Sequence, residues 1–413
     1  MKIAIIGSGI SGMVAAYLLN PDHDITVFEA NDYVGGHTHT VGVEWDGKRY
    51  AVDTGFIVFN EKTYPNFCKL LDKLNVPYQS STMTFSVKCE KTGLEYSPHS
   101  LKTFFGQRKN MISLSFYRMI YGILRFRSRL DRLAIEESES SLGEYLKKNG
   151  YSERFIDHFV IPLASSLWSA DPKEVYNFPL QTFVLFFKNH GFLETTHTIE
   201  WKVIKGGSRQ YVEKIITPYA DHIRLSTAVR NVSRHNDHVE LTTDQGDSAR
   251  FDHVVMAVHS DQALKMLADP SPVEKEVLGA IPYQENQTTL HTDSTVLPER
   301  QPLWSSWNYL IPRKEINRAV LTYNMNILQT IKAPVTFCVT LNKSEGIDGG
   351  QVLGNYVYHH PVYLKSSPLA QKRHGEISGI NRTHYCGAYW GYGFHEDGVN
   401  SALAACKFFG KGL

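Results

Sequence analysis

Glycines near the start of the chain have the type and spacing needed to bind a diphosphate. Residues 7–12 read Gly-Ser-Gly-Ile-Ser-Gly, which is the GxGxxG pattern. Gly7 permits a tight turn, Gly9 lets the backbone approach a phosphate, and Gly12 allows a helix to pack closely on a strand. Free N–H groups at the start of that helix favour a negative charge. The pattern predicts a dinucleotide cofactor.

A carboxylate and a second pair of glycines follow this loop. Glu29 stands seventeen residues past Gly12, where it can accept hydrogen bonds from ribose hydroxyls. Residues 35–38, Gly-Gly-His-Thr, resemble the glycine pair that flavoproteins of the glutathione-reductase and amine-oxidase type place after this carboxylate. The pair would give the backbone a second close approach to the diphosphate. A flexible surface turn is the alternative, but together with Glu29 the pair favours FAD over NAD.

The surrounding segments predict the elements that position these residues. Apolar residues 3–6 read as a buried parallel strand, which is followed by a helix at 13–19 and a second strand at 24–28. Later segments predict a helix at 210–215, strands at 224–229, 239–243 and 252–258, and a helix at 401–408. A discontinuous cofactor domain would draw on all of these segments.

Motifs spread over nearly the whole chain resemble those of the flavin-containing amine oxidase, protoporphyrinogen oxidase and phytoene desaturase superfamily. The chain is most similar to a branch of short NAD/FAD-binding proteins related to the N-terminal region of plant cyclopropane-fatty-acid synthases. The matching segments are 34–38, 53–60, 168–172, 189–191, 201–212, 290–293, 304–309 and 387–398. Two positions depart from the superfamily pattern. His37 stands where many members carry arginine, and Ala388 follows Gly387 where relatives often have an acid.

The resemblance implies cofactor contacts in distant parts of the chain. Gly55 would make room for the isoalloxazine ring, although an ordinary hairpin strand explains residues 53–60 equally well. The backbone of Val229 would meet the adenine, and the helix after Gly398 would aim its N-terminal amides at the flavin N1/O2 edge. The full predicted cofactor-binding set is Gly7, Gly9, Ser11, Gly12, Glu29, Gly35, Gly36, His37, Thr38, Gly55, Phe56, Val229, Gly387, Asp397, Gly398 and Val399.

Catalytic residues are harder to predict, because a flavin enzyme chiefly orients its substrate and excludes water. His291, Tyr392 and Glu396 are the predicted catalytic residues, and His190 is a further acid or base candidate. Histidines of this kind are more often structural than catalytic. The aromatic residues at 389–394 would form a wall facing the flavin or serve as buried packing. The chain lacks a recognisable counterpart of the amine-oxidase flavin lysine, which weakens amine oxidation.

These segments predict an α/β fold with a Rossmann-like FAD domain of the glutathione-reductase type and a discontinuous α+β substrate domain. Residues 1–79, 200–270 and 371–413 would form the FAD domain. Residues 80–199 would form the helical part of the substrate domain, and residues 271–370, rich in Tyr, Thr, Val and Trp, its β-rich part.

A basic segment lies within the helical part. Residues 102–132 hold eight basic side chains against the single acid Asp131. At helical spacing, an apolar stripe from Ile112 to Leu133 falls opposite several arginines. The pattern favours a helix packed on the core with solvated arginines. The alternative is peripheral contact with an anionic membrane surface.

Composition limits the remaining possibilities. The 413 residues are 42% hydrophobic and 21% charged with a formal net charge of +1, which is typical of a globular protein and gives no reason to expect a nucleic-acid partner. Five scattered cysteines without a CxxC pair support neither disulfides nor a zinc site, and we expect no metal. The start of the chain lacks signal-peptide features and no apolar stretch is long enough to span a bilayer, so we expect a cytoplasmic protein, with location at the membrane surface as the alternative.

Three functions remain open at this point. The leading hypothesis is an FAD-dependent oxidoreductase that acts on a hydrophobic, fatty-acyl or lipid-like substrate by hydride transfer to flavin N5. The second is a flavin amine oxidase or a flavin-dependent fatty-acid double-bond isomerase. The third is a non-catalytic flavin-binding partner of a lipid methyltransferase.

Overall fold

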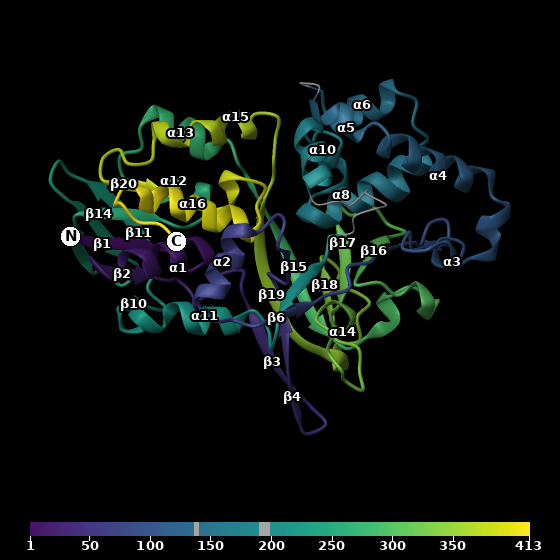
Figure 1. Ribbon diagram of the computed structural model, residues 1–413, viewed down its shortest axis with the longest axis horizontal. Helices are drawn as coiled ribbons and strands as arrows, with labels where there is room; N and C mark the ends of the chain where they lie inside the picture. Colours follow the sequence, from purple (N-terminus) through teal and green to yellow (C-terminus); the bar gives the residue numbers. More distant parts are fainter. Residues whose placement is uncertain (136–139, 190–198) are drawn as a thin grey trace.

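A five-stranded parallel sheet forms the core of the half of the molecule that carries both chain ends (Figure 1). The computed structural model describes residues 1–135, 140–189 and 199–413. The strands follow the spatial order β10-β2-β1-β14-β20. Their bounds are Lys2–Ile6 (β1), Asp24–Phe28 (β2), Ile223–Arg224 (β10), His253–Met256 (β14) and Thr383–Tyr385 (β20). Segments from both ends and the middle of the chain therefore meet in one sheet.

Both faces of this sheet are covered, which explains why β1 is apolar throughout. Ile3 and Ile5 pack into a core with α1 (Ile10–Leu19) and α16 (His395–Lys407). Ala4 and Ile6 point to the other face, where the core includes a three-stranded antiparallel sheet. That sheet consists of β11 (Val229–Arg234), β12 (Val239–Thr243) and β13 (Ser248–Phe251).

A mixed seven-stranded sheet occupies the other half of the molecule, in the order β19-β15-β18-β17-β16-β7-β8. Its strands are β7 (Phe85–Cys89), β8 (Leu94–Tyr96), β15 (Tyr283–His291), β16 (Trp307–Ile311), β17 (Val320–Asn324), β18 (Cys338–Leu341) and β19 (Val352–Pro361). The β7–β16 pair is parallel and joins strands that are about two hundred residues apart in sequence. The two insertions predicted from the sequence are thus joined through one sheet, although the division into domains stays a prediction.

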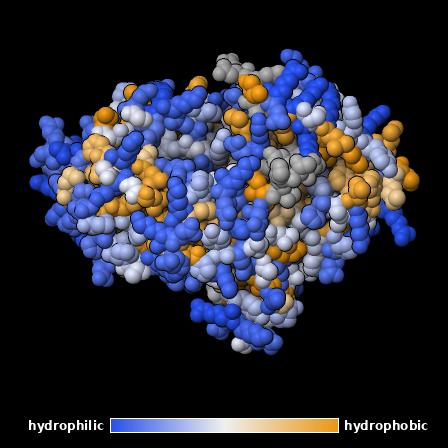
Figure 2. Space-filling model, viewed as in Figure 1, coloured by the Kyte–Doolittle hydropathy of each residue, from blue (hydrophilic) through white to orange (hydrophobic). Residues whose placement is uncertain are grey.

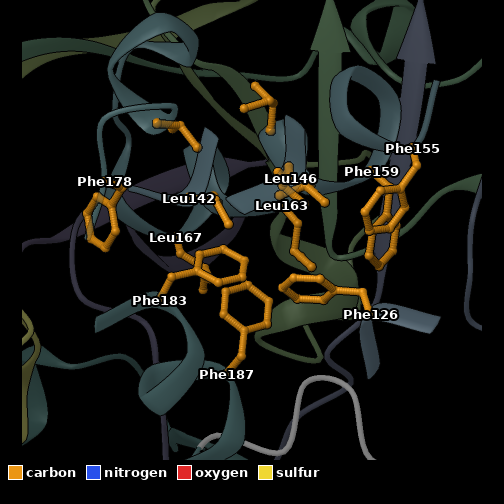
Figure 3. Close-up of a cluster of buried hydrophobic side chains, with 14 of the residues drawn as sticks. Phe126, Leu142, Leu146, Phe155, Phe159, Leu163, Leu167, Phe178, Phe183 and Phe187 are labelled. Atoms are coloured by element: carbon orange, nitrogen blue, oxygen red, sulfur yellow. The ribbon is translucent and has the colours of Figure 1, made fainter. Parts of the chain in front are cut away.

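Helices gather beside this sheet, in the upper right of Figure 1, and share an aromatic core. Figure 3 shows Phe126, Phe155, Phe183 and Phe187 gathered in this core, with Phe183 and Phe187 coming from one helix and the other two from two further helices. The helices are α3 (Leu101–Phe104), α4 (Leu114–Arg127), α5 (Leu130–Ile135), α6 (Leu142–Lys148), α7 (Glu153–Phe155), α8 (Ile161–Trp168), α9 (Pro172–Val175) and α10 (Leu180–Asn189). Among the described residues, no helix is both long and apolar enough to cross a membrane.

Smaller elements complete the fold. The hairpin of β3 (Thr40–Trp45) and β4 (Lys48–Asp53) and the three-stranded sheet of β5 (Val58–Asn60), β9 (Trp201–Ile204) and β6 (Tyr78–Ser80) lie near the junction of the two halves (Figure 1). The remaining helices are α2 (Pro65–Lys73), α11 (Arg209–Ile216), α12 (Ser260–Met266), α13 (Pro272–Gly279), α14 (Met325–Leu328) and α15 (Ser367–Lys372). All five cysteines are buried and free.

Three element predictions need correction. The predicted strand at 224–229 ends at Arg224, because the chain turns at Ser226, which has a φ of 48°, and Val229 begins a separate sheet. The C-terminal helix begins at His395, six residues earlier than predicted. The predicted amphipathic stripe does not run along one helix, since α4 ends at Arg127 and Ile112 precedes it.

Candidate functional site

The first glycine loop has the geometry of a diphosphate cradle. Gly7 has a φ of +97°, and a Cβ at Gly12 would overlap the carbonyl oxygen of Gly7, so neither position admits a side chain. A Cβ built on Gly9 meets nothing within 4 Å, so the loop is open where a ligand would approach. Gly9 also precedes α1 without a side-chain cap, which leaves the first N–H groups of the helix available.

The second glycine pair leans against the first loop. Gly35 has a φ of +128°, and its N–H donates to the carbonyl of Ser8 at 3.1 Å. A Cβ on Gly36 would lie 3.2 Å from the Cα of Gly9. The structure therefore brings together two glycine motifs whose loops are separated by β2.

Glu29 and Val229 lie close together at the end of β2. Both carboxylate oxygens of Glu29 accept hydrogen bonds, one from the N–H and hydroxyl of Ser8 at 2.9 and 2.6 Å, the other from Asn31. Thr227 N donates to the Glu29 carbonyl at 2.9 Å and places Val229, at the start of β11, next to this strand end. This arrangement fits a site for the adenosine part of a dinucleotide.

The N-termini of α1 and α16 converge. The Ser11 hydroxyl donates to the carbonyl of Gly398 at 2.9 Å, and a Cβ on Gly398 would lie 2.6 Å from Ile10 Cγ2. Val399 is fully buried in the core that includes α1. Two helix dipoles thus point their positive ends toward neighbouring positions, which favours negative charge there.

Asp397 organises the turn that leads into α16. Its Oδ2 accepts hydrogen bonds from Phe394 N at 2.9 Å and Tyr392 N at 3.0 Å. Burial raises the pKa of Asp397 to about 7, although these hydrogen bonds act in the opposite direction. At the start of the same turn, Gly387 N donates to Ser401 Oγ at 2.9 Å. The observed contacts of Asp397 are those of a backbone anchor beside the predicted flavin site.

A buried polar triangle joins the second glycine segment to α11 and α16. Thr38 Oγ1 lies 2.6 Å from Tyr211 OH and 3.0 Å from His395 Nε2, and the last two atoms are 3.0 Å apart. Burial lowers the pKa of His395 well below its usual value, so the imidazole is neutral. The ring of Phe56 stacks on His395 with centroids 3.4 Å apart. Sequence reasoning missed His395 and Tyr211 as site residues, although both lie within segments that carry the family resemblance.

Gly55 packs against the backbone of His37, which directly follows the second glycine pair. A Cβ at Gly55 would overlap the carbonyl oxygen of His37, and Phe56 N donates to that carbonyl at 2.8 Å. The need for glycine at this position thus comes from a close approach of two backbone segments.

Imidazoles and phenols cluster beside the glycine loops. The ring of His37 lies 5.8 Å from that of His259, 5.4 Å from that of His360 and 5.2 Å from that of Tyr358. Burial lowers the pKa of His37 to about 4, and the same cause lowers those of His259 and His360 to about 3. The Nε2 atom of His37 is buried without a hydrogen-bond partner among the described residues.

The predicted acid and base residues have structural contacts in this structure. The Glu396 carboxylate accepts from Asn66 N at 3.1 Å and Phe67 N at 2.9 Å, and so caps α2. His291 is buried with its Nε2 2.7 Å from Thr340 Oγ1, and burial lowers its pKa to about 4. It lies at the opposite end of β15 from Tyr283, whose ring stacks on His259. His190 lies outside the described residues.

Tyr392 lies in an aromatic wall built from several segments. Its ring centroid is 5.7 Å from that of Phe186, which stacks on Phe394 at 5.0 Å and lies 4.8 Å from Trp168. Trp168 Nε1 donates to the carbonyl of Tyr392 at 3.2 Å. Phe394 packs against both the helical core and the core around α1. The wall thus connects the predicted flavin site to the helices.

The residues present fit FAD. The N-terminus of α1 is uncapped beside open space at Gly9, and the α16 N-terminus points to the same region. The segment that approaches Gly9 through Gly36 also carries the unpartnered imidazole nitrogen of His37. These features would bind a diphosphate and an adjoining ring that becomes negatively charged on reduction.

Sequence comparisons agree with this geometry. The model of the family described as flavin containing amine oxidoreductase matches residues 10–290. A probable zeta-carotene desaturase of Synechococcus elongatus is 23% identical over 268 residues, which cover 60% of this chain and 53% of that protein. The 15-cis-phytoene desaturase of the same organism is 30% identical over 190 residues, covering 42% of this chain and 39% of that protein. The chain thus spans about half the length of the desaturases it matches, or less.

Solved structures share the fold along its whole length. Cyclohexylamine oxidase from Brevibacterium oxydans superposes with a TM-score of 0.70 at 17% identity, covering 99% of both chains. A fatty acid isomerase from P. acnes that produces CLA superposes with a TM-score of 0.66 at 15% identity, covering 98% of both. These matches confirm the predicted fold class.

The family match covers about two thirds of the chain and includes the second glycine pair, Glu29 and β14. The uncapped helix and the paired glycine loops explain physically why FAD is the cofactor. The chain therefore belongs to the flavin containing amine oxidoreductase family.

Proposed function

We propose that the chain oxidises a hydrophobic substrate of the fatty-acyl or similar lipid type. The observation that carries this proposal is the aromatic wall of Trp168, Phe186, Tyr392 and Phe394. Aromatic side chains bind long apolar chains through large contact areas and need few directed polar contacts. The names of several relatives point in the same direction, since they are carotenoid desaturases.

The protein's own groups would hold the cofactor and align the substrate. When bound, FAD supplies an acceptor for a hydride taken from a substrate C–H bond. The two glycine loops would bind the diphosphate, while the backbone amides at the start of α16 would favour negative charge at the flavin edge. The neutral triangle of Thr38, Tyr211 and His395 would fix the segment that carries Phe56.

The aromatic wall would position the substrate and exclude water from the site. Tyr392 is half-buried and burial raises the pKa of its hydroxyl, so this group stays protonated at neutral pH. We infer that the Tyr392 ring acts by orientation. Acid or base roles for His291 and Glu396 stay predictions, and the mechanism proposed here does not need them.

Anaerobic reduction of the purified holoprotein tests the substrate class. We expect a fatty-acyl lipid to bleach the oxidised flavin absorption, and a panel of primary amines to leave it unchanged. Bleaching by amines with release of peroxide under air would instead support an amine oxidase. A rearranged lipid formed without net oxidation would support a double-bond isomerase.

Absence of reduction by any compound, together with stable association with a lipid methyltransferase, would support a non-catalytic role. Photoreduction followed by reoxidation serves as the control that the bound flavin is redox-active.

A further inference from the structure

Large apolar side chains are exposed at unusual density between α3 and α4. Of eighteen large hydrophobic side chains exposed among the described residues, seven lie in residues 101–124. Ile112 is 89% exposed and Leu114 is 69% exposed. Figure 2 shows hydrophobic atoms gathered at the right edge of the molecule, where Figure 1 places α3 and α4. Contiguous exposed apolar surface of this kind marks an interaction site.

The helix α4 has two apolar faces, and only one of them packs on the protein. Phe116, Met119 and Phe126 are buried in the helical core, and Gly122 lets the helix approach the ring of Phe155 closely. The apolar stripe predicted from the sequence between Ile112 and Leu133 thus faces the protein core over much of its length. A second stripe of Leu114, Tyr117, Tyr121 and Leu124 is exposed, and its spacing of three, four and three residues places it along one side of the helix.

We define the α4 face as Leu101, Ile112, Leu114, Tyr117, Tyr121 and Leu124. At 100° per residue, the buried side chains of α4 lie opposite this face. The face is therefore not part of the hydrophobic core and needs another environment to bury it.

Positive charge surrounds the α4 face. Lys102, Arg108 and Arg118 are exposed, and none of them forms an ion pair with an acidic residue that the structure describes. Arg125 lies about two turns further along the same side as Arg118, with its guanidinium over the ring of Tyr151. Residues 102–132 contain eight basic side chains and one acid. A surface that combines exposed apolar groups with one sign of charge is suited to lipid phosphates and the acyl region beneath them.

We propose that the α4 face docks the protein onto the surface of an anionic lipid bilayer. The helix would lie in the plane of the interface, because its 14 residues extend only about 21 Å, too short to span the hydrocarbon region. The exposed leucines and tyrosines would enter the boundary between headgroups and acyl chains, while Lys102, Arg108 and Arg118 contact lipid phosphates. This proposal goes beyond the oxidation of a lipid-like substrate and does not depend on it.

Flotation of the FAD-loaded protein with vesicles tests the docking. We expect the protein to float with phosphatidylcholine vesicles that contain phosphatidylglycerol, and to remain in solution with phosphatidylcholine alone or at high salt. Replacing Arg118 with Gln should weaken binding about fivefold, the effect of one basic group near the surface.

Paired variants separate docking from folding. Leu114→Ser combined with Leu124→Ser should abolish flotation while the flavin spectrum is retained, because both side chains are exposed. The matched control is Leu369→Ser combined with Ile380→Ser, which removes two exposed apolar side chains elsewhere and should leave flotation unchanged.

Failure of the wild-type protein to float on anionic vesicles would overturn the proposal. Equal flotation by the α4 double variant and its control would do so as well. Concentration-dependent self-association that the α4 double variant abolishes, without vesicle binding, would assign the face to a second copy of the chain instead.

Discussion

Gly9 and Gly12 differ in how closely the rest of the protein approaches them. A Cβ at Gly12 would overlap the backbone of Gly7, whereas a Cβ at Gly9 has free space in the protein itself. Gly12 is thus required by the fold, whereas the predicted role of Gly9 is to let the backbone approach the ligand. Gly55 and Gly36 resemble Gly12 in this respect, because another backbone segment approaches each of them, that of His37 at Gly55 and that of Gly9 at Gly36.

This distinction predicts opposite results for two alanine substitutions. Gly12→Ala should lower the free energy of unfolding of the FAD-free protein by about 1–3 kcal/mol, because the backbone must shift. Gly9→Ala should leave that value unchanged and weaken FAD binding. Urea unfolding and FAD titration measure the two effects, with Gly375→Ala, at another open glycine, as the control. Equal destabilisation by both substitutions would contradict the assignment.

The lowered pKa of His37 predicts that both the stability of the protein and its affinity for FAD depend on pH. Burial lowers its pKa from 6.5 to about 4, so the unfolded chain binds a proton more readily than the folded one. This group therefore stabilises the FAD-free protein above pH 6.5, and that contribution is lost as the pH falls toward 4. The negative charge of a bound diphosphate would favour the protonated form of the His37 imidazole. Because protonation then strengthens FAD binding, FAD affinity should rise as the pH falls, whereas the stability of the FAD-free protein decreases.

Unfolding and FAD titrations between pH 5 and 8 would measure both effects of His37. His37→Gln should flatten both profiles, while His235→Gln, at an exposed site, should not. An FAD affinity that does not change with pH in the wild-type protein would argue against a role of His37 at the diphosphate.

Substitutions of Tyr392 distinguish a role in orienting the substrate from a role in proton transfer. If the ring orients the substrate, Tyr392→Phe should keep kcat and KM near the wild-type values, whereas Tyr392→Ser should raise KM. A loss of kcat in Tyr392→Phe by a factor of about 100 or more would instead assign the hydroxyl to acid or base catalysis.

At the scale of secondary structure, prediction succeeded where contacts are local. Residues 3–6 are apolar because β1 is covered on both faces, and the glycine loop follows directly, so one segment specifies strand, turn and helix. The α4 face could not be predicted in this way. Both sides of this helix carry apolar residues, and only packing against Phe155 and its neighbours selects the buried side.

The contact between Glu396 and α2 indicates that this side chain caps the helix. Glu396→Ala should destabilise the protein by about 1–2 kcal/mol, because two N–H groups at the start of α2 lose their acceptor. Glu396→Gln keeps a carbonyl oxygen and should retain most stability and turnover. Thermal unfolding and steady-state rates distinguish the two roles: a stable Gln variant without turnover would restore the catalytic interpretation.

At the scale of the whole molecule, the cofactor site joins parts of the chain that are far apart in sequence. Ser11 contacts Gly398, and Thr38 contacts both Tyr211 and His395. Such contacts have no periodic signal in the sequence. Family resemblance pointed to the segments that carry them, but the triangle around Thr38 became visible only with the fold.

If FAD binds at the predicted residues, it would link these segments. A ligand that binds only the folded state stabilises it by about 2.7 kcal/mol at a concentration of 100 times its Kd. The most direct test of the account is the flavin content of the purified chain after reconstitution with FAD and gel filtration. We predict equimolar flavin that Gly9→Ala reduces without unfolding the protein. A folded wild-type chain that retains no flavin under any condition would contradict the account.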